Sequence, residues 1–126
     1  MNNKKILICG LGAIGGYYAS KFQDKDFDLR ILVDKERYTK YRNTPRVVNG
    51  KEYEFKYTLP EDKDYKADLI IISTKSSGLD NAVINIKNFV KDSTIIMSFL
   101  NGVTSEEKIS QKYGKDKVLY SYLLGH

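Results

Sequence analysis

Short apolar blocks alternate with amphipathic stretches along the chain, in the order that strand–helix repeats produce. Apolar runs at residues 6–9 and 67–73 are typical of strands that are buried on both faces. Further strands are predicted over residues 27–33, 94–99 and 117–123. Apolar residues at spacings of three and four predict helices over residues 13–22, 80–90 and 104–113, and a short charged helix is predicted over residues 35–42.

A hairpin interrupts this repeat at residues 46–53, where Asn49-Gly50 suits a two-residue type I′ turn. The alternation of Tyr53, Phe55 and Tyr57 then predicts a half-exposed strand. The element order predicts an α/β fold of the Rossmann type. We expect a doubly wound, mostly parallel sheet with helices on both faces and a small hairpin insertion, forming one dinucleotide-binding domain over residues 1–126.

A glycine-rich motif lies between the first predicted strand and the first predicted helix, the context that a dinucleotide-binding loop requires. It reads Gly10-Leu11-Gly12-Ala13-Ile14-Gly15. Gly10 permits a tight turn, Gly12 lets a pyrophosphate approach the backbone, and Gly15 lets the helix pack closely on the strand. The helix N-terminus then offers free N–H groups to the phosphates.

Asp34 follows the second predicted strand, about 20 residues beyond the motif, where a carboxylate accepts hydrogen bonds from the adenosine ribose. Such a carboxylate favours NAD and repels the 2′-phosphate of NADP. Lys35 and Arg37 follow at once and could bind that phosphate. Asp34 could instead cap the next helix, with both basic residues in solvent. The sequence therefore predicts NAD or NADP, with a slight preference for NAD.

Two further loops follow predicted strands whose carboxyl ends should open on the side of the glycine loop. Lys75 follows the strand at 67–73 and offers positive charge, while Asn101 follows the strand at 94–99 and offers an amide donor and acceptor. Each residue could equally be an ordinary surface lysine or part of an Asn-Gly turn. We treat both as candidate cofactor ligands, and Asn101 also as a candidate substrate ligand.

Composition excludes several other classes of protein. The chain has 41% hydrophobic residues and a net charge of +5, but its basic residues are scattered among acidic ones, which argues against nucleic-acid binding. No apolar run reaches the roughly 20 residues of a membrane span, and we expect a cytoplasmic protein. Cys9 and His126 are the only cysteine and histidine, too few for a Cys/His metal site. No metal is expected.

The combined motifs resemble those of a known family. Gly10 to Tyr18, Thr74-Lys75 after an apolar strand, and Asn101-Gly102-Val103 after the next strand are similar to the N-terminal domain of ketopantoate reductase, or 2-dehydropantoate 2-reductase. The resemblance spans essentially the whole chain. It implies NADPH-dependent reduction of 2-dehydropantoate or a related 2-oxoacid, in pantothenate and coenzyme A synthesis. It also places Lys75 and Asn101 near the nicotinamide and the substrate.

The resemblance also implies a C-terminal helical domain that supplies the catalytic lysine and most substrate contacts. We expect this chain to be part of a longer protein and inactive alone, with no catalytic residue of its own, and a homodimer is possible. The family often has an arginine where this chain has Asp34. One alternative is a nucleotide-sensing regulatory domain of a potassium channel or transporter, which also has a glycine motif and a following aspartate. Lys75 and Asn101 favour the reductase.

Overall fold

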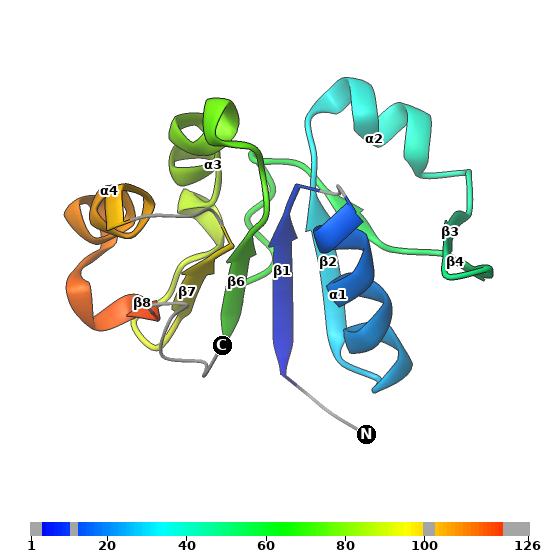
Figure 1. The fold of residues 1–126 in the computed structure, drawn as a ribbon, viewed down its shortest axis with the longest axis horizontal. Coiled ribbons are helices and arrows are strands. Elements are labelled where there is room, and N and C mark those ends of the chain that lie inside the picture. The colour runs from blue at the N-terminus through cyan, green and yellow to red at the C-terminus, as the bar shows by residue number, and fades with distance from the viewer. Residues whose placement is uncertain (1–3, 11–12, 100–102, 120–126) are drawn as a thin grey trace.

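The computed structural model describes residues 4–10, 13–99 and 103–119. These form a six-stranded sheet in the order β5-β2-β1-β6-β7-β8 and a separate two-stranded sheet, β3-β4 (Figure 1). The strands are β1 (Lys5–Cys9), β2 (Asp28–Leu32), β3 (Arg46–Val48), β4 (Lys51–Tyr53), β5 (Tyr57–Thr58), β6 (Leu69–Ile72), β7 (Ile95–Ser98) and β8 (Val118–Leu119). The α-helices are α1 (Ala13–Asp24), α2 (Lys35–Tyr41), α3 (Leu79–Asn85) and α4 (Val103–Tyr113).

Strand β1 lies at the centre of the large sheet and pairs with β2 on one side and β6 on the other. Within the described residues, every pair of neighbouring strands in this sheet is parallel. Ile6 is in register with Leu29 of β2 and with Leu69 of β6. Parallel pairing requires a crossover between strands, and the helices supply it, so the predicted doubly wound fold is confirmed.

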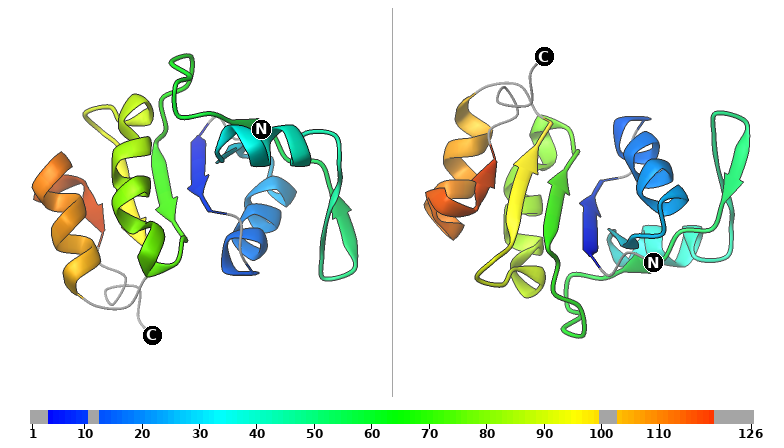
Figure 2. Two further views of the ribbon diagram at one scale, coloured as in Figure 1. Left: turned by 90° about the horizontal axis from the view of Figure 1, so that it is seen from above. Right: turned by 90° about the horizontal axis from the view of Figure 1, so that it is seen from below.

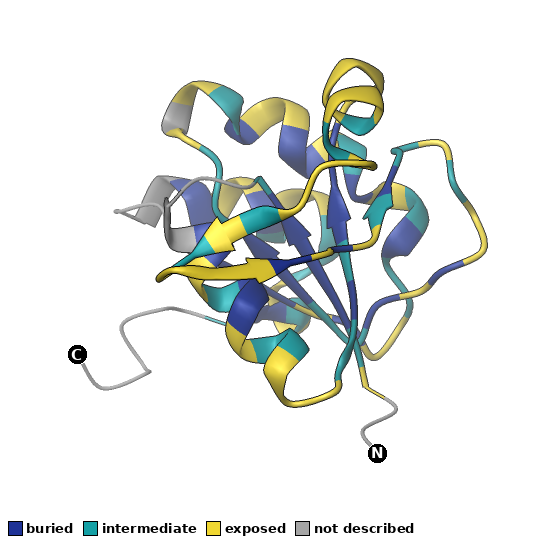
Figure 3. Ribbon diagram, turned by 90° about the vertical axis from the view of Figure 1, so that its right-hand side faces the viewer, coloured by how far each residue is buried: buried dark blue, intermediate teal, exposed yellow. Residues whose placement is uncertain are grey.

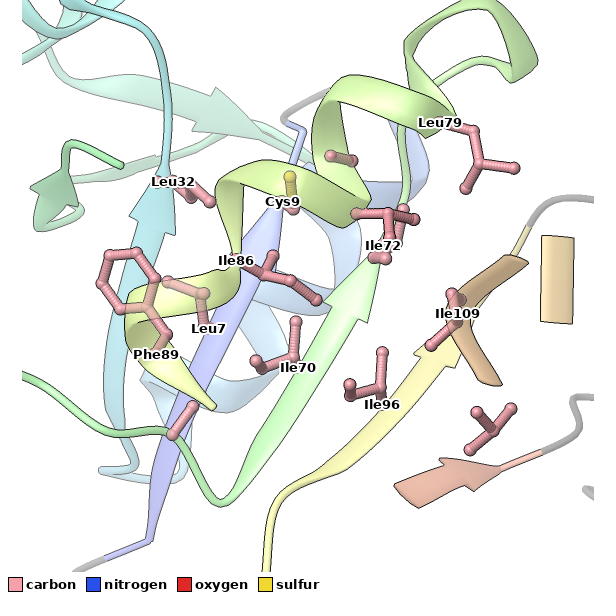
Figure 4. Close-up of a cluster of buried hydrophobic side chains, with 14 of the residues drawn as sticks. Leu7, Cys9, Leu32, Ile70, Ile72, Leu79, Ile86, Phe89, Ile96 and Ile109 are labelled. Carbon is pink, nitrogen blue, oxygen red and sulfur yellow. The ribbon is translucent and has the colours of Figure 1, made fainter. Parts of the chain in front are cut away.

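The two faces of the sheet carry separate hydrophobic cores because successive side chains of each strand point to opposite faces. One core joins Leu7, Ile70 and Ile96 to α3 and to Ile109 of α4 (Figure 4). The other joins Ile8 and its neighbours on the sheet to α1, α2 and the hairpin. Strands buried on both faces read as continuous apolar runs, which explains the sequence pattern of β1 and β6.

The hairpin β3-β4 lies at the end of the molecule opposite α4, as the views from above and below show (Figure 2). Asn49 and Gly50 have φ angles of 50° and 79°. Positive φ at both positions is what a type I′ turn requires. The tip of the hairpin at Asn49 and Gly50 is exposed, while the strands of the large sheet lie buried behind it (Figure 3).

The hairpin packs against α1 through a small number of side chains. Val48 and Tyr53 belong to the core beneath it. Tyr53 Oη donates a hydrogen bond to Asp24 Oδ2 at 2.9 Å, and Lys51 Nζ lies 3.2 Å from Asp24 Oδ1. The hairpin is therefore attached to the C-terminal end of α1.

Two predicted elements are wrong in extent. The helix predicted over 80–90 ends as α3 at Asn85 and continues as a 3₁₀ turn, Lys87–Phe89. The tighter turn buries Phe89 completely, while Asn88 Nδ2 donates to the Pro60 carbonyl oxygen at 2.8 Å. Tertiary packing thus overrides the helical spacing there.

The strand predicted from Tyr53, Phe55 and Tyr57 is not continuous. Tyr53 ends β4, β5 begins only at Tyr57, and Phe55 lies in neither strand. Tyr53 and Phe55 are both buried and their rings stack with centroids 5.5 Å apart. The alternation therefore reflects a connection packed on the core. The strand predicted over 117–123 is present at Val118–Leu119; Lys117 belongs to a 3₁₀ turn, Lys115–Lys117, and residues 120–123 lie outside the described residues.

Candidate cofactor site

A cleft of about 640 Å³ opens at the carboxyl ends of β1, β2 and β6. In Figure 1 the arrowheads of β1 and β6 lie between α2 and α3. Parallel strands expose their ligand sites at this edge. Four of the predicted cofactor ligands contribute to the lining, namely Gly10, Asp34, Arg37 and Lys75.

Gly10 and Gly15, at the two ends of the glycine motif, have the tight turn and the close packing that the sequence predicts for them. Gly10 has φ +97°, a conformation that side chains disfavour. A Cβ atom on Gly15 would lie 2.4 Å from the Gly10 carbonyl oxygen and 2.7 Å from Ser73 Oγ. Only a residue without a side chain fits there, so α1 can begin directly against the end of β1.

Three of the predicted ligands, Leu11, Gly12 and Asn101, lie outside the described residues. Ala13 and Ile14 form the first two positions of α1, at the end of the helix that faces the cleft edge of the sheet. Ser73 completes the turn, because its Oγ donates a hydrogen bond to the Gly10 carbonyl oxygen at 2.8 Å. This contact joins the end of β6 to the glycine turn.

Asp34 is the N-cap of α2, so the capping interpretation of this residue is seen in the structure. Its Oδ1 accepts a hydrogen bond from the Arg37 backbone N–H at 2.8 Å. Its Oδ2 accepts from Arg37 Nη1 at 2.6 Å. Both side chains line the cleft, whereas Lys35 is exposed and does not line it.

Lys75 and Thr74 follow β6 on the opposite wall of the cleft from Asp34. Lys75 is exposed. Thr74 Oγ1 is buried and has no hydrogen-bond partner among the described residues. A buried hydroxyl without a partner is uncommon in folded proteins, and a polar ligand in the cleft could supply one.

Cys9 lies at the base of the cleft. Burial raises the pKa of its thiol from 9.0 to about 12. Because the thiolate is the nucleophilic form, a thiol with this pKa is unreactive at neutral pH. Cys9 is therefore a small core residue.

Sequence reasoning missed most of the wall that α3 and the preceding loop form. It also missed Tyr41 and Pro60, which complete the side near α2. These residues follow no motif and meet only through tertiary packing. The one available signal for these residues was that the loop after β6 lies at the carboxyl end of a parallel strand, where ligands bind. The further lining residues are Ser73, Thr74, Ser77, Gly78, Asn81, Ala82 and Asn85.

The described residues fit an adenine dinucleotide. Gly10 and Gly15 leave no room for side chains, the cleft contains a hydroxyl at Thr74 without a partner among the described residues, and a carboxylate with an adjacent guanidinium lies at the end of β2. No three potential metal-ligating side chains gather within the described part of the chain. No described helix combines the length and apolar character needed to cross a membrane.

The sequence profile of the family described as ketopantoate reductase PanE/ApbA matches residues 6–124. The chain belongs to the ketopantoate reductase family. A 2-dehydropantoate 2-reductase of Aquifex aeolicus is 30% identical over 125 residues, covering 95% of this chain and 39% of that protein. These matches confirm the predicted family and give no support to the channel-sensor alternative.

Solved structures of oxidoreductases share the fold of this chain. A 2-dehydropantoate 2-reductase from Geobacter metallireducens superposes with a TM-score of 0.76 at 20% identity, over 92% of this chain and 40% of that one. A D-mandelate dehydrogenase in complex with NADH and anilino(oxo)acetate has a TM-score of 0.74 at 26% identity, over 92% of this chain and 39% of that one. The chain thus spans about two fifths of the length of these relatives.

Proposed function

We propose that this chain is the NAD(P)-binding domain of a reductase that acts on 2-oxoacids. The observation that carries the proposal is the single cleft that joins the glycine turn at Gly10 to the Asp34–Arg37 pair. One end suits a pyrophosphate and the other an adenosine ribose. The spacing between these groups along the chain is that of a dinucleotide-binding motif.

In the proposed complex the pyrophosphate lies at the start of α1, over Gly10 and Gly12, with the backbone N–H groups of Ala13 and Ile14 nearby. Helix N-termini favour anions through these N–H groups. Asp34 accepts hydrogen bonds from the ribose, and Arg37 or Lys35 contacts a 2′-phosphate where one is present. Lys75 and Asn101 contact the nicotinamide half, and Asn101 also orients the substrate.

When bound, a reduced nicotinamide would supply the hydride for reduction of a 2-oxoacid carbonyl. Reduction also requires a proton donor near the forming alkoxide. Cys9 is unsuited to donate this proton, because it is buried and its pKa is raised. The family resemblance assigns the role of proton donor to a lysine in a second domain. We therefore propose that the 126 residues bind cofactor but catalyse no reduction on their own.

The proposed substrate is 2-dehydropantoate or a related 2-oxoacid, which would place the full protein in pantothenate and coenzyme A synthesis. The D-mandelate dehydrogenase neighbour shows that the same fold also carries a different oxidoreductase. We further propose that the protein acts in the cytoplasm, with the C-terminal domain of the same polypeptide as its partner. A homodimer is compatible with this proposal.

Isothermal titration calorimetry with NADH and NADPH tests the binding proposal. The wild-type chain should bind at least one of them, and Gly12→Val should abolish binding because its side chain would occupy the pyrophosphate position. Circular dichroism of Gly12→Val establishes that the variant is folded. Unchanged affinity in a folded Gly12→Val protein would show that the glycine loop is not the site.

A second experiment compares the 126 residues with the full-length polypeptide. The full-length protein should oxidise NADH or NADPH in the presence of 2-dehydropantoate, whereas the 126 residues should not. Turnover by the shorter chain would place the proton donor within it and make Lys75 the first candidate.

A further inference from the structure

We propose that a second cavity, between the C-terminal end of α2 and the edge strand β5, binds a small molecule that carries a phosphate or carboxylate group on a planar ring. The cavity has a volume of about 580 Å³, within the usual range for small-molecule sites. Among the described residues, it shares no lining residue with the cofactor cleft. The proposal therefore stands or falls separately from dinucleotide binding.

Helix α2 separates the two cavities. Tyr38 and the C-cap residue Arg42 line the second cavity. Arg37 and Tyr41 line the cofactor cleft instead. Because residues four positions apart lie on the same face of a helix, each cavity is lined by its own face of α2. The rest of the second cavity is lined from β2, β5 and the segments next to β5, namely by Arg30, Phe55, Lys56, Tyr57, Asp62 and Asp64.

Two basic residues of this cavity have no ion-pair partner among the described residues. Arg42 and Lys56 are both exposed, and none of the ion pairs in the described part of the chain includes either of them. The Arg42 guanidinium lies over the Tyr38 ring, 5.8 Å from its centroid. A guanidinium group binds phosphate or carboxylate oxygens through paired hydrogen bonds, and an ammonium group adds a point charge. Both groups are therefore available to an anionic ligand.

The two carboxylates in the lining already have partners within the protein. Asp62 Oδ2 accepts hydrogen bonds from Thr58 Oγ1 at 2.6 Å and from the Leu59 N–H at 2.9 Å. Asp64 accepts two hydrogen bonds from Arg30, at 3.1 and 3.2 Å, and this guanidinium lowers the pKa of the Asp64 carboxyl. Neither carboxylate therefore pairs with the two remaining basic residues, which leaves the cavity suited to an anion.

Three aromatic side chains supply the apolar part of the lining. Phe55 is buried, and Tyr38 and Tyr57 are half-buried. Burial raises the pKa of Tyr57, so its phenol stays neutral at physiological pH. Aromatic side chains bind planar rings in stacked or edge-to-face arrangements. A ring that carries an anionic group would thus use both the aromatic and the basic part of the lining.

The length of β5 favours a small molecule over a peptide. An extended peptide can add a strand to an exposed sheet edge, but β5 consists of only Tyr57 and Thr58. The carbonyl oxygens of Lys56 and Thr58 accept hydrogen bonds from the neighbouring β2 segment at 2.8 and 3.0 Å. Because the backbone groups of successive residues in a strand alternate in direction, Tyr57 alone turns its N–H and C=O groups to the open edge. One residue is too few to hold a peptide strand.

Ligand-observed NMR with the full-length polypeptide tests the site, with NADH present to fill the cofactor cleft. Phenyl phosphate and benzoate are the combined probes, because each joins a ring to an anionic group. Inorganic phosphate lacks the ring, and phenol lacks the anionic group. At least one combined probe should bind with a dissociation constant of about 1 mM or tighter. Inorganic phosphate and phenol should bind at least about fivefold more weakly, because each uses only one part of the lining.

Two variants assign the binding to this cavity. Arg42→Met and Lys56→Met should each weaken binding of the combined probes about tenfold, the usual effect of losing a charge-assisted hydrogen bond. Lys40→Met is the matched control, because Lys40 is an exposed basic residue of the same helix that lines neither cavity. It should change probe affinity by less than about twofold. The affinity for NADH should stay the same in all three variants.

Several results would overturn the proposal. If neither combined probe binds, the cavity is not a site for this class of ligand. Unchanged probe affinity in both Arg42→Met and Lys56→Met would place the binding elsewhere, and an equal loss in Lys40→Met would reduce it to general electrostatics. Inorganic phosphate binding as tightly as phenyl phosphate would remove the role of the aromatic rings. If NADH fails to bind while the probes behave as expected, the proposed function fails and this second site stands.

Discussion

Gly15 lies so close to Gly10 that a methyl group on it would approach the Gly10 carbonyl oxygen to 2.4 Å. The contact joins the first turn of α1 to the first glycine of the motif, directly after β1. It explains the third glycine of the motif through the packing of helix on strand, without reference to any ligand. The same contact fixes where the N-terminus of α1 lies relative to the cleft.

Gly15→Ala should therefore destabilise the protein by about 1–3 kcal/mol, the usual range for an overpacked core position, and should weaken cofactor binding by displacing α1. Gly16→Ala is a matched control, because its Cβ would meet only Val48 Cγ2 at 3.9 Å. That variant should gain up to about 1 kcal/mol from helix propensity. Urea unfolding measures both, and equal stability of the two variants would contradict the packing argument.

Ser73→Ala should weaken the contact between the end of β6 and the glycine turn. The variant deprives the Gly10 carbonyl oxygen of the hydroxyl that now lies 2.8 Å away. Loss of one such bond should lower the free energy of unfolding by about 1 kcal/mol and also weaken binding of the dinucleotide. The effect on binding is measured by calorimetry.

Ser110→Ala is the control for this prediction. Ser110 Oγ makes a similar bond, 2.9 Å to the Glu107 carbonyl oxygen, on the exposed side of α4. Its removal should leave cofactor affinity unchanged. Equal affinity of the Ser73 and Ser110 variants would show that Ser73 does not support the site.

The raised pKa of the Cys9 thiol leads us to expect that the protein loses stability at alkaline pH. Its pKa is about 12 in the folded protein, against 9.0 for an unperturbed cysteine thiol, because burial disfavours the thiolate. A raised folded pKa means that the stabilising contribution is complete below pH 9 and is lost as pH rises from 9 to 12. The unfolding free energy should fall in that window by roughly 1.4 kcal/mol per pH unit from this group alone.

Cys9→Ala should flatten this part of the profile, even if it lowers stability at neutral pH. Tyr113→Phe separates a second contribution, because burial raises the pKa of Tyr113 from 10.0 to about 12 and its effect begins one pH unit higher. Urea unfolding at a series of pH values measures all three proteins. A Cys9→Ala profile as steep as that of the wild type would contradict the assignment.

The attachment of the hairpin to α1 can be followed through Asp24. The hydrogen bond from Tyr53 is the main reason that the pKa of Asp24 is lowered, and Lys51 adds to the effect. Tyr53→Phe and Lys51→Met should therefore each raise the pKa of Asp24, as measured by NMR titration of the carboxyl carbon. Because the pKa of Asp24 is lowered on folding, its contribution to stability is lost as the pH falls. An unchanged pKa of Asp24 in both variants would contradict the attachment of the hairpin through this carboxylate.

Much of the fold could be predicted from the sequence because its signals are local. Continuous apolar runs mark β1 and β6, and Asn49-Gly50 marks the hairpin turn. The glycine motif and Asp34 were also recognisable, since their spacing along the chain is fixed by one strand–helix–strand unit. The wall that Asn81 and Asn85 add to the cleft could not be predicted, because it depends on how α3 packs across the sheet.

The end of α3 shows the same limit in another form. Apolar spacing extended the predicted helix to residue 90, but the chain tightens at Lys87–Phe89. The contacts responsible are the Asn88 amide on Pro60 and the Phe89 carbonyl oxygen, which accepts from Ala67 N–H at 2.8 Å. These partners are distant in sequence, and no local sequence pattern predicts the contacts.

The central place of β1 has a consequence for how the chain must fold during synthesis. β1 leaves the ribosome before the strands that pair with it, which begin only at Asp28 and Leu69. Until β6 emerges, one edge of this buried central strand has no neighbour, and such an edge readily pairs with other chains. Nascent chains that end before Leu69 should therefore aggregate or recruit chaperones, and the risk should end abruptly once Ile72 has emerged to complete the pairing.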